Sequence, residues 1–347
     1  MKVKIGELTK IKTGKLDANA SSEEGKYPFF TCSKEPLRIS TYSYDCECVL
    51  VAGNGDLNVK YYNGKFDAYQ RTYIIEDDSS GKLHMPYLYY FMESYVNELR
   101  QQAIGGVIKY IKLGNLTDAL VELPPIDHQK AIVEILEKAR RILDKRNEEM
   151  NALDDLIKAR FVELFGDPVS NSKGLKELTL PELGELGRGV SKHRPRNAPE
   201  LLGGEYPLIQ TGEVSNAGLY IENYENTYSE LGYKQSKMWK AGTLCITIAA
   251  NIAKTAILRF DACFPDSVVG FKANDKTNEI FIHYWFSFFQ AILEAQAPES
   301  AQKNINLKIL SELKVIAPDI EEQNKFATFV VQVDKSKVVY IDKKDKL

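Results

Sequence analysis

The sequence is poor in the residues that build disulfide frameworks and metal sites. It holds 5 cysteines, an odd number without CxxC spacing, and 4 scattered histidines among 347 residues. This usage indicates neither a disulfide-stapled fold nor a zinc site, so we expect no bound metal. A run of about 20 apolar residues and a signal-like N-terminus are also missing. The composition therefore predicts a soluble protein of the cytoplasm.

Motifs of the common enzyme classes are missing as well. The sequence has no Walker-type phosphate loop, no HExxH and no GxSxG. VLVAGNG, at 49–55, could pass for the glycine loop of an S-adenosylmethionine or dinucleotide site, but it lacks the βαβ context of such sites. LPPI, at 123–126, lacks the polar and aromatic residues of an amino-methyltransferase loop. We expect turns at both places, no cofactor site and no catalytic residue.

Charge is balanced and sets a limit on nucleic-acid binding. The chain has 45 Lys and Arg against 48 Asp and Glu, a net charge of −3 at pH 7. This balance excludes a uniformly basic protein, so any nucleic-acid surface must be local. The length of 347 residues and the 44% hydrophobic content suit two domains with cores of their own.

An internal duplication organises the chain. LPPIDHQKAIVEIL, at 123–136, resembles APDIEEQNKFATFV, at 317–330, in register, because 318 − 124, 320 − 126 and 323 − 129 all equal 194. The same offset pairs Val121 with Val315 and Ile111 with Ile305. Nearer the N-terminus the offset falls to 179 (206 − 27) and 175 (182 − 7), so the second copy carries insertions in its early loops.

A period of this length indicates a repeated domain and not a solenoid unit. We therefore predict an α+β fold with two tandem pseudo-symmetric domains, each followed by a long helix. The expected boundaries are 1–125 for the first domain, 126–167 for its helix, 168–318 for the second domain and 319–347 for the short second helix.

Each proline turn precedes a predicted helix. Asp127 and Glu321 follow the turns, where a carboxylate can accept hydrogen bonds from the first free N–H groups. From Asp127 an apolar stripe runs without Gly or Pro until Gly166, which predicts a helix about 58 Å long. The pattern alone also fits an ordinary core helix, but the second helix could cover the stripe by packing antiparallel. The residues expected at this helix-pair interface are Ile132, Leu136, Ala139, Leu143, Met150, Leu153, Ile157, Leu164, Phe326, Phe329, Val330 and Val333.

The remainder of each repeat is rich in predicted strands. β-Branched and aromatic runs in 47–75 alternate with turn signals at 53–55 and at Asn63-Gly64, as in hairpins. MPYLYYFMESYVNELRQQA, at 85–103, then predicts a helix. The second copy repeats this order, with strands in 243–264 and a helix at 279–297.

Turns and strand ends of both repeats hold residues that suit DNA. Arg and Lys reach phosphates or guanine edges, and Asn and Gln can pair bidentately with adenine. Any one of them could be a solvated loop side chain, so only the ensemble indicates binding. The densest group is KHRPR, at 192–196. The candidate DNA-binding residues are Lys34, Arg38, Tyr42, Asn54, Asn58, Lys60, Tyr61, Gln70, Arg71, Lys109, Tyr110, Lys192, His193, Arg194, Arg196, Gln210, Lys234, Gln235, Ser236, Asn251, Lys254, Lys303 and Asn304.

The organisation resembles the specificity subunit of type I restriction-modification systems. Two variable domains, each followed by a proline turn, DHQ or EEQ and a long helix, are similar to that family, as is the helix ending ARFVELFGDP. YPFFTCSKEP, AGNGDLN and FDAYQRTYII resemble one type of target recognition domain. The resemblance implies that each domain reads one half of a split DNA sequence. It also implies that the helices form an antiparallel coiled coil, set the spacer and bind two methyltransferase subunits.

The same resemblance implies a non-catalytic chain within a DNA adenine methyltransferase and restriction endonuclease complex. S-adenosylmethionine would then belong to the methyltransferase partner, and ATP and Mg²⁺ to the restriction subunits. One departure from the family is that the second predicted helix, which stops at Leu347, is shorter than the first. Two other classes stay open: a self-contained DNA-modifying methyltransferase or nuclease, which the missing motifs disfavour, and a coiled-coil scaffold without DNA affinity.

Overall fold

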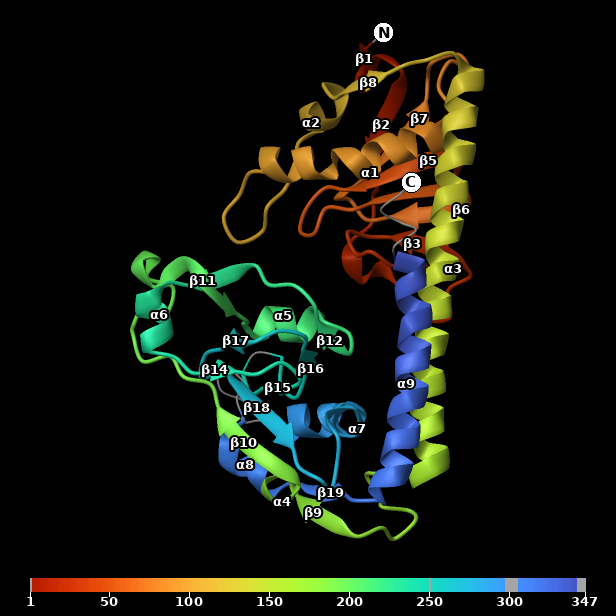
Figure 1. Cartoon of the computed structure of the whole chain (residues 1–347). Helices are drawn as coiled ribbons and strands as arrows, with labels where there is room; N and C mark the ends of the chain where they lie inside the picture. Colours follow the sequence, from red (N-terminus) through yellow and green to blue (C-terminus); the bar gives the residue numbers. More distant parts are fainter. Residues whose placement is uncertain (1, 250, 297–304, 342–347) are drawn as a thin grey trace. The chain divides into compact units, whose positions relative to one another are not determined.

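The duplication is visible in the order of the helices and strands (Figure 1). The computed structural model describes residues 2–249, 251–296 and 305–341. The chain divides into two compact units, Met1–Arg146 and Asn147–Leu347, called unit 1 and unit 2 below. The division falls inside one continuous helix, α3 (Ile126–Phe165), which therefore contributes residues to both.

Unit 1 is built on a six-stranded sheet with the order β2-β7-β5-β6-β3-β4. Its pairs are antiparallel except for β3 and β6. The end of β5, VLVA at 49–52, is buried throughout, which explains its unbroken apolar run. β1 and β8 form a separate antiparallel pair. The strands are β1 (Lys2–Lys4), β2 (Thr9–Thr13), β3 (Tyr27–Phe30), β4 (Leu37–Ile39), β5 (Tyr44–Ala52), β6 (Val59–Ala68), β7 (Thr72–Asp77) and β8 (Leu120–Glu122).

Helix α1 (Met85–Gln102) packs across β5 and β6 of this sheet (Figure 1). Its buried residues recur at helical spacing, and Leu88, Met92 and Leu99 are fully buried. The other helices of unit 1 besides α3 are short: η1 (Ile5–Glu7), η2 (Ala18–Ala20) and α2 (Leu113–Thr117).

Unit 2 contains a five-stranded sheet, β10-β18-β15-β16-β12, a four-stranded sheet, β13-β11-β17-β14, and the antiparallel pair β19-β9. The residues between β10 and β15 carry the insertions that the shrinking offset predicts. The strands are β9 (Glu177–Thr179), β10 (Gly184–Arg188), β11 (Leu202–Leu208), β12 (Tyr220–Ile221), β13 (Asn226–Tyr228), β14 (Met238–Trp239), β15 (Leu244–Thr247), β16 (Thr255–Leu258), β17 (Ala262–Cys263), β18 (Val268–Ala273) and β19 (Lys314–Ile316).

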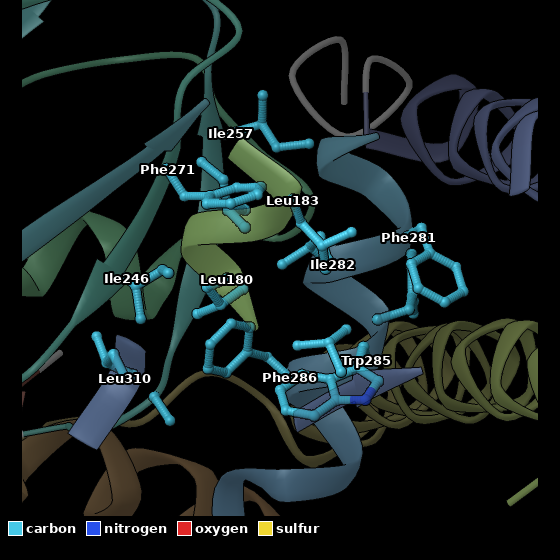
Figure 2. Close-up of a cluster of buried hydrophobic side chains, with 14 of the residues drawn as sticks. Leu180, Leu183, Ile246, Ile257, Phe271, Phe281, Ile282, Trp285, Phe286 and Leu310 are labelled. Atoms are coloured by element: carbon cyan, nitrogen blue, oxygen red, sulfur yellow. The ribbon is translucent and has the colours of Figure 1, made fainter. Parts of the chain in front are cut away.

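The core of unit 2 forms where α7 faces the five-stranded sheet. Figure 2 shows Leu180 and Leu183 between Phe271 of β18 and Ile282 and Phe286 of α7. All of these side chains are fully buried, and together they exclude water from the inner face of the sheet. The helices are α4 (Leu180–Leu183), η3 (Pro199–Leu201), α5 (Thr211–Asn216), α6 (Glu230–Lys234), α7 (Glu279–Gln296), α8 (Leu307–Glu312) and α9 (Ile320–Ile341).

Equivalent elements of the two units lie at the offsets that the sequence indicates. β1 and β2 correspond to β9 and β10 at offset 175, since 177 − 2 and 184 − 9 agree. α1, β8 and the start of α3 correspond to α7, β19 and the start of α9 at offset 194, since 279 − 85, 314 − 120 and 320 − 126 agree. The predicted helix at 85–103 is thus confirmed to within one residue, and that at 279–297 is confirmed up to Gln296, since residue 297 lies outside the described residues.

The predicted antiparallel helix pair forms within unit 2. α9 runs beside the C-terminal half of α3 (Figure 1), where Phe161 packs edge-on against Phe326 at 5.3 Å and Asp154 forms an ion pair with Lys337. Residue numbers fall on one helix as they rise on the other, so the direction is antiparallel. Of the predicted interface residues, Ile157, Phe326, Val330 and Val333 are buried in one cluster, with Leu153, Leu164 and Phe329 packed against it and Met150 half-buried beside a cavity.

The predicted stripe has a different environment in the first half of α3. Four of its residues are exposed, namely Ile132, Leu136, Ala139 and Leu143, whereas the neighbouring Val133 is buried within unit 1. Arg140 ties this half to α1, donating from Nη1 to the Tyr89 hydroxyl at 2.8 Å. A helix carrying exposed Ile and Leu at this spacing offers an apolar surface to another protein.

Two local predictions are wrong. Asn63-Gly64 is no hairpin turn, because β6 runs straight through it, pairing Asn63 with Glu47 while Gly64 adopts a φ of +138° inside the strand. Asp127 is not the cap of α3. The helix begins one residue earlier, at Ile126, and its first backbone bonds run from the N–H groups of His128 and Gln129 to the Pro125 carbonyl. Asp127 instead lies in the first turn, where its charge still favours the helix dipole. The same holds for Glu321, because α9 begins at Ile320 and Glu321 lies in its first turn.

Candidate nucleic-acid interface

Backbone hydrogen bonds gather five loops of unit 1 at one edge of its sheet. The N–H of Gly14 donates to Thr72 O at 3.0 Å, and the N–H of Gly53 donates to Arg71 O at 2.8 Å. Gly53 O accepts from the N–H of Ile111 at 2.9 Å, so the loop before α2 joins the same edge. We call this surface the loop edge of unit 1; it consists of residues 14–17, 31–36, 53–58, 69–71 and 104–112.

The loop edge of unit 1 brings together most of the candidate residues of the first repeat. Arg71, Lys109 and Lys34 are exposed there, and Asn54 pairs with Tyr110 through a backbone bridge. Two cavities lie on it. One of about 520 Å³ is lined by Lys15, Gln70, Arg71 and neighbouring residues, and one of about 550 Å³ by Cys32, Asn54, Tyr69, Ile108 and neighbouring residues.

Some candidates at this edge already have intramolecular partners. Asn58 donates from Nδ2 to Cys32 O at 2.8 Å and to Asp56 O at 2.9 Å, so its amide holds two loops together. Lys60 donates to Asn58 Oδ1, and burial lowers the pKa of its ammonium group. Gln70 donates from Nε2 to Asp17 Oδ1 at 2.9 Å. The side chains of Asn58 and Lys60 therefore hold the loops of the edge in place and are less available to a ligand.

Four candidates of the first repeat lie on strands or next to them, outside the loop edge: Lys60 of β6, which adjoins it, and three others. Arg38 belongs to β4, where it pairs with Pro28 of β3. The Tyr42 ring packs at a tilt against Tyr27, with the ring centroids 4.9 Å apart, and lies under the Lys65 ammonium. Tyr61 donates its hydroxyl to Glu47 Oε1 at 2.7 Å. Sequence reasoning could not separate these from the loop residues because strand register places them.

Unit 2 repeats the arrangement with matching backbone bonds. The N–H of Gly189 donates to Val268 O at 2.9 Å, as Gly14 does to Thr72 in unit 1. Ile248 O accepts from the N–H of Ile305 at 3.0 Å, as Gly53 does from Ile111. The loop edge of unit 2 consists of residues 189–198, 248–249, 251–254, 264–267 and 305–306.

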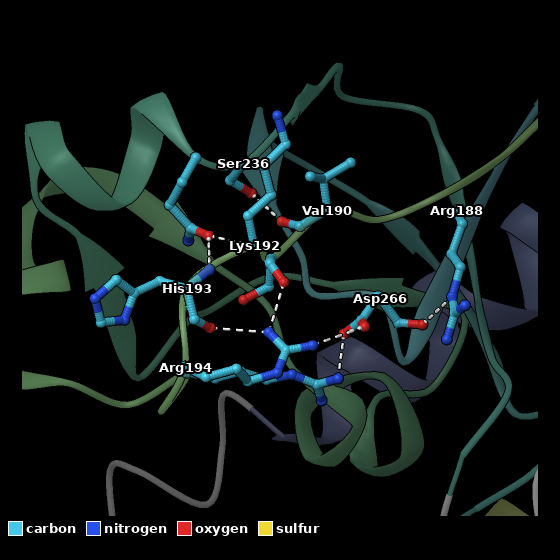
Figure 3. Close-up of polar contacts among 10 residues, drawn as sticks. Arg188, Val190, Lys192, His193, Arg194, Ser236 and Asp266 are labelled. Atoms are coloured by element: carbon cyan, nitrogen blue, oxygen red, sulfur yellow. Dashed lines mark hydrogen bonds and ion pairs between the residues drawn. The ribbon is translucent and has the colours of Figure 1, made fainter.

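The basic segment at 192–196 is held on this edge by acidic and amide groups (Figure 3). Arg194 and Arg196 both form ion pairs with Asp266, the former at 3.3 Å, and Arg188 donates to the Asp266 carbonyl. Gln235 Oε1 accepts from the N–H groups of Lys192 at 2.5 Å and His193 at 3.0 Å.

These contacts leave the segment exposed but fixed in shape. Ser236 donates to Val190 O at 2.8 Å and is half-buried, so Ser236 and Gln235 support the segment. Lys192, His193, Arg194 and Arg196 are all exposed. Arg194 and Arg196 share the Asp266 carboxylate and Arg188 binds the Asp266 carbonyl, so the cluster keeps a positive excess that suits a phosphate or a guanine.

The other candidates of unit 2 are more scattered. Gln210 precedes α5 and is exposed, and Lys234 pairs with Glu230 within α6 at 3.5 Å. Asn251 is exposed and accepts from Thr247 through its carbonyl, while Lys254 lines a cavity of about 490 Å³ near α3 and α9. Lys303 and Asn304 lie outside the described residues.

The repeat also contains a pair of equivalent glutamines, Gln129 and Gln323, for which the sequence alone indicates no role. Gln129 is fully buried and donates from Nε2 to Lys82 O and Pro124 O, both at 2.8 Å, while Oε1 accepts from His84 N at 2.8 Å. Gln323 is equally buried and donates to Lys276 O at 3.0 Å and Pro318 O at 2.8 Å.

The acceptors are equivalent in the two units, because 276 − 82 and 318 − 124 both equal the 194-residue offset. Each glutamine therefore joins the proline turn, the long helix and the segment that leads into α1 or α7. We call each glutamine with its backbone partners a glutamine clamp. The sequence signal for it is the glutamine that DHQ and EEQ share, at a helix position that faces the preceding domain.

Sites of two other kinds are absent from the described residues. No group of three or more His, Cys, Asp or Glu side chains is placed to hold a metal ion within the ranges given above. No helix in that part of the chain is both long and apolar enough to cross a membrane.

The basic segment gives a direct prediction. Replacing Arg194 or Arg196 by alanine should weaken sequence-specific DNA binding by about 1 to 3 kcal/mol if the contact is to a base, or lower the salt dependence if it is to phosphate. Binding titrations of the DNA complex across a salt series would measure both. Lys240→Ala is the matched control, because Lys240 also pairs with an aspartate, Asp261, at 2.7 Å but lies outside the loop edge. Unchanged affinity and salt slope would make both arginines ordinary solvated loop residues.

The chain thus contains two α+β units, and each has loops gathered at one sheet edge and a long helix held by a buried glutamine. This arrangement defines a class of two-domain recognition proteins. Residues 1–153 and 173–345 match the family model of the type I restriction modification DNA specificity domain, and the chain belongs to this family.

Similar proteins come from several organisms. The type I restriction enzyme EcoDI specificity subunit of Escherichia coli is 28% identical over 364 residues, covering 95% of this chain and 80% of the relative. The MjaVIII specificity subunit of Methanocaldococcus jannaschii is 23% identical, covering 99% and 88%. The crystal structure of a type I system S subunit from M. genitalium superposes with a TM-score of 0.60 at 17% identity, covering 100% of this chain and 92% of that one. The last likeness confirms the fold with its two tandem domains.

Proposed function

We propose that this chain is the non-catalytic, sequence-specific DNA recognition subunit of a type I restriction-modification complex. Each unit reads one half of a bipartite target through its loop edge. The observation that carries the proposal is the duplicated edge itself. The same backbone bonds recur through Gly14 and Gly189, and each edge precedes a helix held by a buried glutamine.

The chemistry of the two edges supports DNA as the ligand. Exposed Arg71 and Lys109 in unit 1, and exposed Arg194 and Arg196 in unit 2, can bind phosphates or guanine edges. Two separate edges on one chain suit two half-sites, which a single edge would not. The net charge of −3 gives little non-specific attraction, so binding should depend on these local surfaces.

The partners follow from family membership and from the exposed helix surface. We infer that two methyltransferase subunits dock on the long helices, where Ile132, Leu136 and Leu143 are exposed on α3. S-adenosylmethionine belongs to those subunits in this proposal, and ATP and Mg²⁺ belong to restriction subunits that join the complex. The helices set the spacing between the half-sites, and the complex works in the cytoplasm.

The proposal predicts that the purified chain alone neither methylates nor cleaves DNA and binds it weakly. Mixed with its methyltransferase partner, the chain should direct adenine methylation to one bipartite sequence. Mapping methylated adenines across a genome, with chain alone, partner alone and both together, makes the test. S-adenosylmethionine turnover by the chain alone would indicate a self-contained enzyme. A complex that methylates without sequence preference, or a chain that leaves the partner inactive, would indicate a scaffold.

A further inference from the structure

The loop between α1 and α2 presents apolar side chains to solvent. Val107 is fully exposed at 103% of its reference area, Ile108 is 62% exposed, and Ile104 is 44% exposed. A single exposed apolar residue is common, but three on one short loop form a patch that indicates contact with another molecule. Residues 104–108 are called the apolar tip below.

The apolar tip is held in a defined shape. Ile104 and Tyr110 exchange backbone hydrogen bonds at 3.0 and 2.8 Å, and Gly55 N donates to Lys109 O at 3.0 Å. Gly105 has a φ of +121°, and a Cβ there would lie 2.6 Å from Ile108 O. The turn therefore requires glycine, and its bonds fix the tip against the loop that follows β5.

The surroundings of the apolar tip fit the major groove of DNA. Lys109 and Lys112 follow it closely in the sequence and are exposed. The neighbouring loop, 53–58, holds one acidic residue, Asp56, which forms an ion pair with Arg100 at 3.2 Å. The two exposed lysines next to the tip favour a polyanion.

An apolar group and an amide also meet at this point. Ile108 and Asn54 line the same cavity of about 550 Å³. In the major groove thymine alone among the four bases offers a methyl group, and an amide pairs with adenine. This juxtaposition suits an A·T pair and would gain little from G·C.

We propose that Val107 and Ile108 contact a thymine methyl group and so specify an A·T pair in the half-site of unit 1. This inference rests on the proposed function and adds a chemical identity to one position that the chain reads. The contact is sequence-specific because the other bases place no methyl group at that point of the groove.

Deoxyuridine, which lacks only the methyl group, tests the contact directly. Each thymine of both half-sites is replaced in turn, and the affinity of the complex with its methyltransferase partner is measured. The affinity of the wild-type complex should fall about fourfold at one or two positions of a single half-site, which is the effect of burying one methyl group. Val107→Ala and Ile108→Ala complexes should bind thymine DNA more weakly and be indifferent to deoxyuridine at those positions.

The control variant is Leu113→Ala, which removes an apolar side chain that is 46% exposed in the adjacent α2 and lies beyond the tip. It should keep the wild-type deoxyuridine profile. All three positions are exposed, so thermal unfolding should match the wild-type chain and exclude a folding defect.

Three results would overturn the inference. Wild-type affinity could be insensitive to deoxyuridine at every position. Alternatively, deoxyuridine could reduce the DNA affinity of the tip variants as much as that of the wild type at every position. The tip variants could instead fail to bind the methyltransferase subunit while their DNA profile stays intact, which would make the tip a protein contact. In each case site-specific methylation by the wild-type complex would leave the proposed function standing. Loss of all sequence specificity in the wild type would remove both.

Discussion

Gln129→Glu is expected to destabilise unit 1 by roughly 3 to 5 kcal/mol. The glutamine Nε2 donates to two carbonyls, Lys82 O and Pro124 O, at 2.8 Å each, in a fully buried place. A carboxylate has no hydrogen to donate, so both carbonyls would lose their partner and face a negative charge. Each unpaired buried acceptor costs about 1 to 3 kcal/mol, and the buried charge adds to this.

Urea unfolding of the whole chain, with hydrogen exchange of separate peptides, would measure the effect. Protection should fall in peptides that cover the starts of α1 and α3, since Gln129 joins both. Gln101→Glu is the control, because it makes the same chemical change at an exposed position of α1. Equal stability of the two variants would mean that the clamp contributes no more than a surface contact.

The duplication provides a second, independent copy of this experiment. Gln323 donates to Lys276 O at 3.0 Å and Pro318 O at 2.8 Å, and it accepts from the Thr277 hydroxyl at 2.8 Å. Gln323→Glu should therefore reduce protection in peptides of unit 2 that cover the starts of α7 and α9. Peptides around Gln129 should keep theirs if each clamp acts within its own unit.

The regular parts of the fold could be predicted from the sequence because they depend on short-range pattern. Helical spacing of apolar residues indicated α1, α3 and α7, and the register of the repeat anticipated α9. The turn predicted at Asn63-Gly64 failed because the same dipeptide serves either a hairpin or a glycine of positive φ within a strand. Only the pairing partner, here Glu47 and Cys46 of β5, decides between the two.

The candidate site was less predictable because its geometry depends on residues distant in sequence. The composition of KHRPR indicated an anion-binding segment, but not that Asp266, 72 residues from Arg194, pairs with its arginines. Asn58 looked like a base-reading amide, yet its Nδ2 hydrogens are used on Cys32 O and Asp56 O. Nothing in the sequence indicates that Val107 and Ile108 are exposed, since apolar residues usually lie inside a protein.

Lengthening α3 by four residues after Glu149 is expected to shift methylation to targets with a longer gap between unchanged half-sites. This expectation rests on the proposed function, in which the helix sets the spacing. Four residues add about 6 Å of helix, and DNA rises about 3.4 Å per base pair, so the gap should grow by one or two base pairs. The insertion precedes Leu153, so the α3 residues that pack on α9 keep their contacts.

Methylation at the original spacing should fall by two orders of magnitude or more, because a shifted edge meets several wrong base pairs at about 1 to 3 kcal/mol each. Four residues turn the helix by about 400°, close to one full turn, so the edge keeps nearly its original direction. A two-residue insertion at the same point is the control, since it turns the helix by about 200° and should abolish methylation at every spacing. Genome-wide mapping of methylated adenines distinguishes the outcomes. An unaltered gap with full activity in the four-residue variant would mean that α3 does not measure the DNA, and altered half-sites would mean that the insertion had disturbed the loop edges.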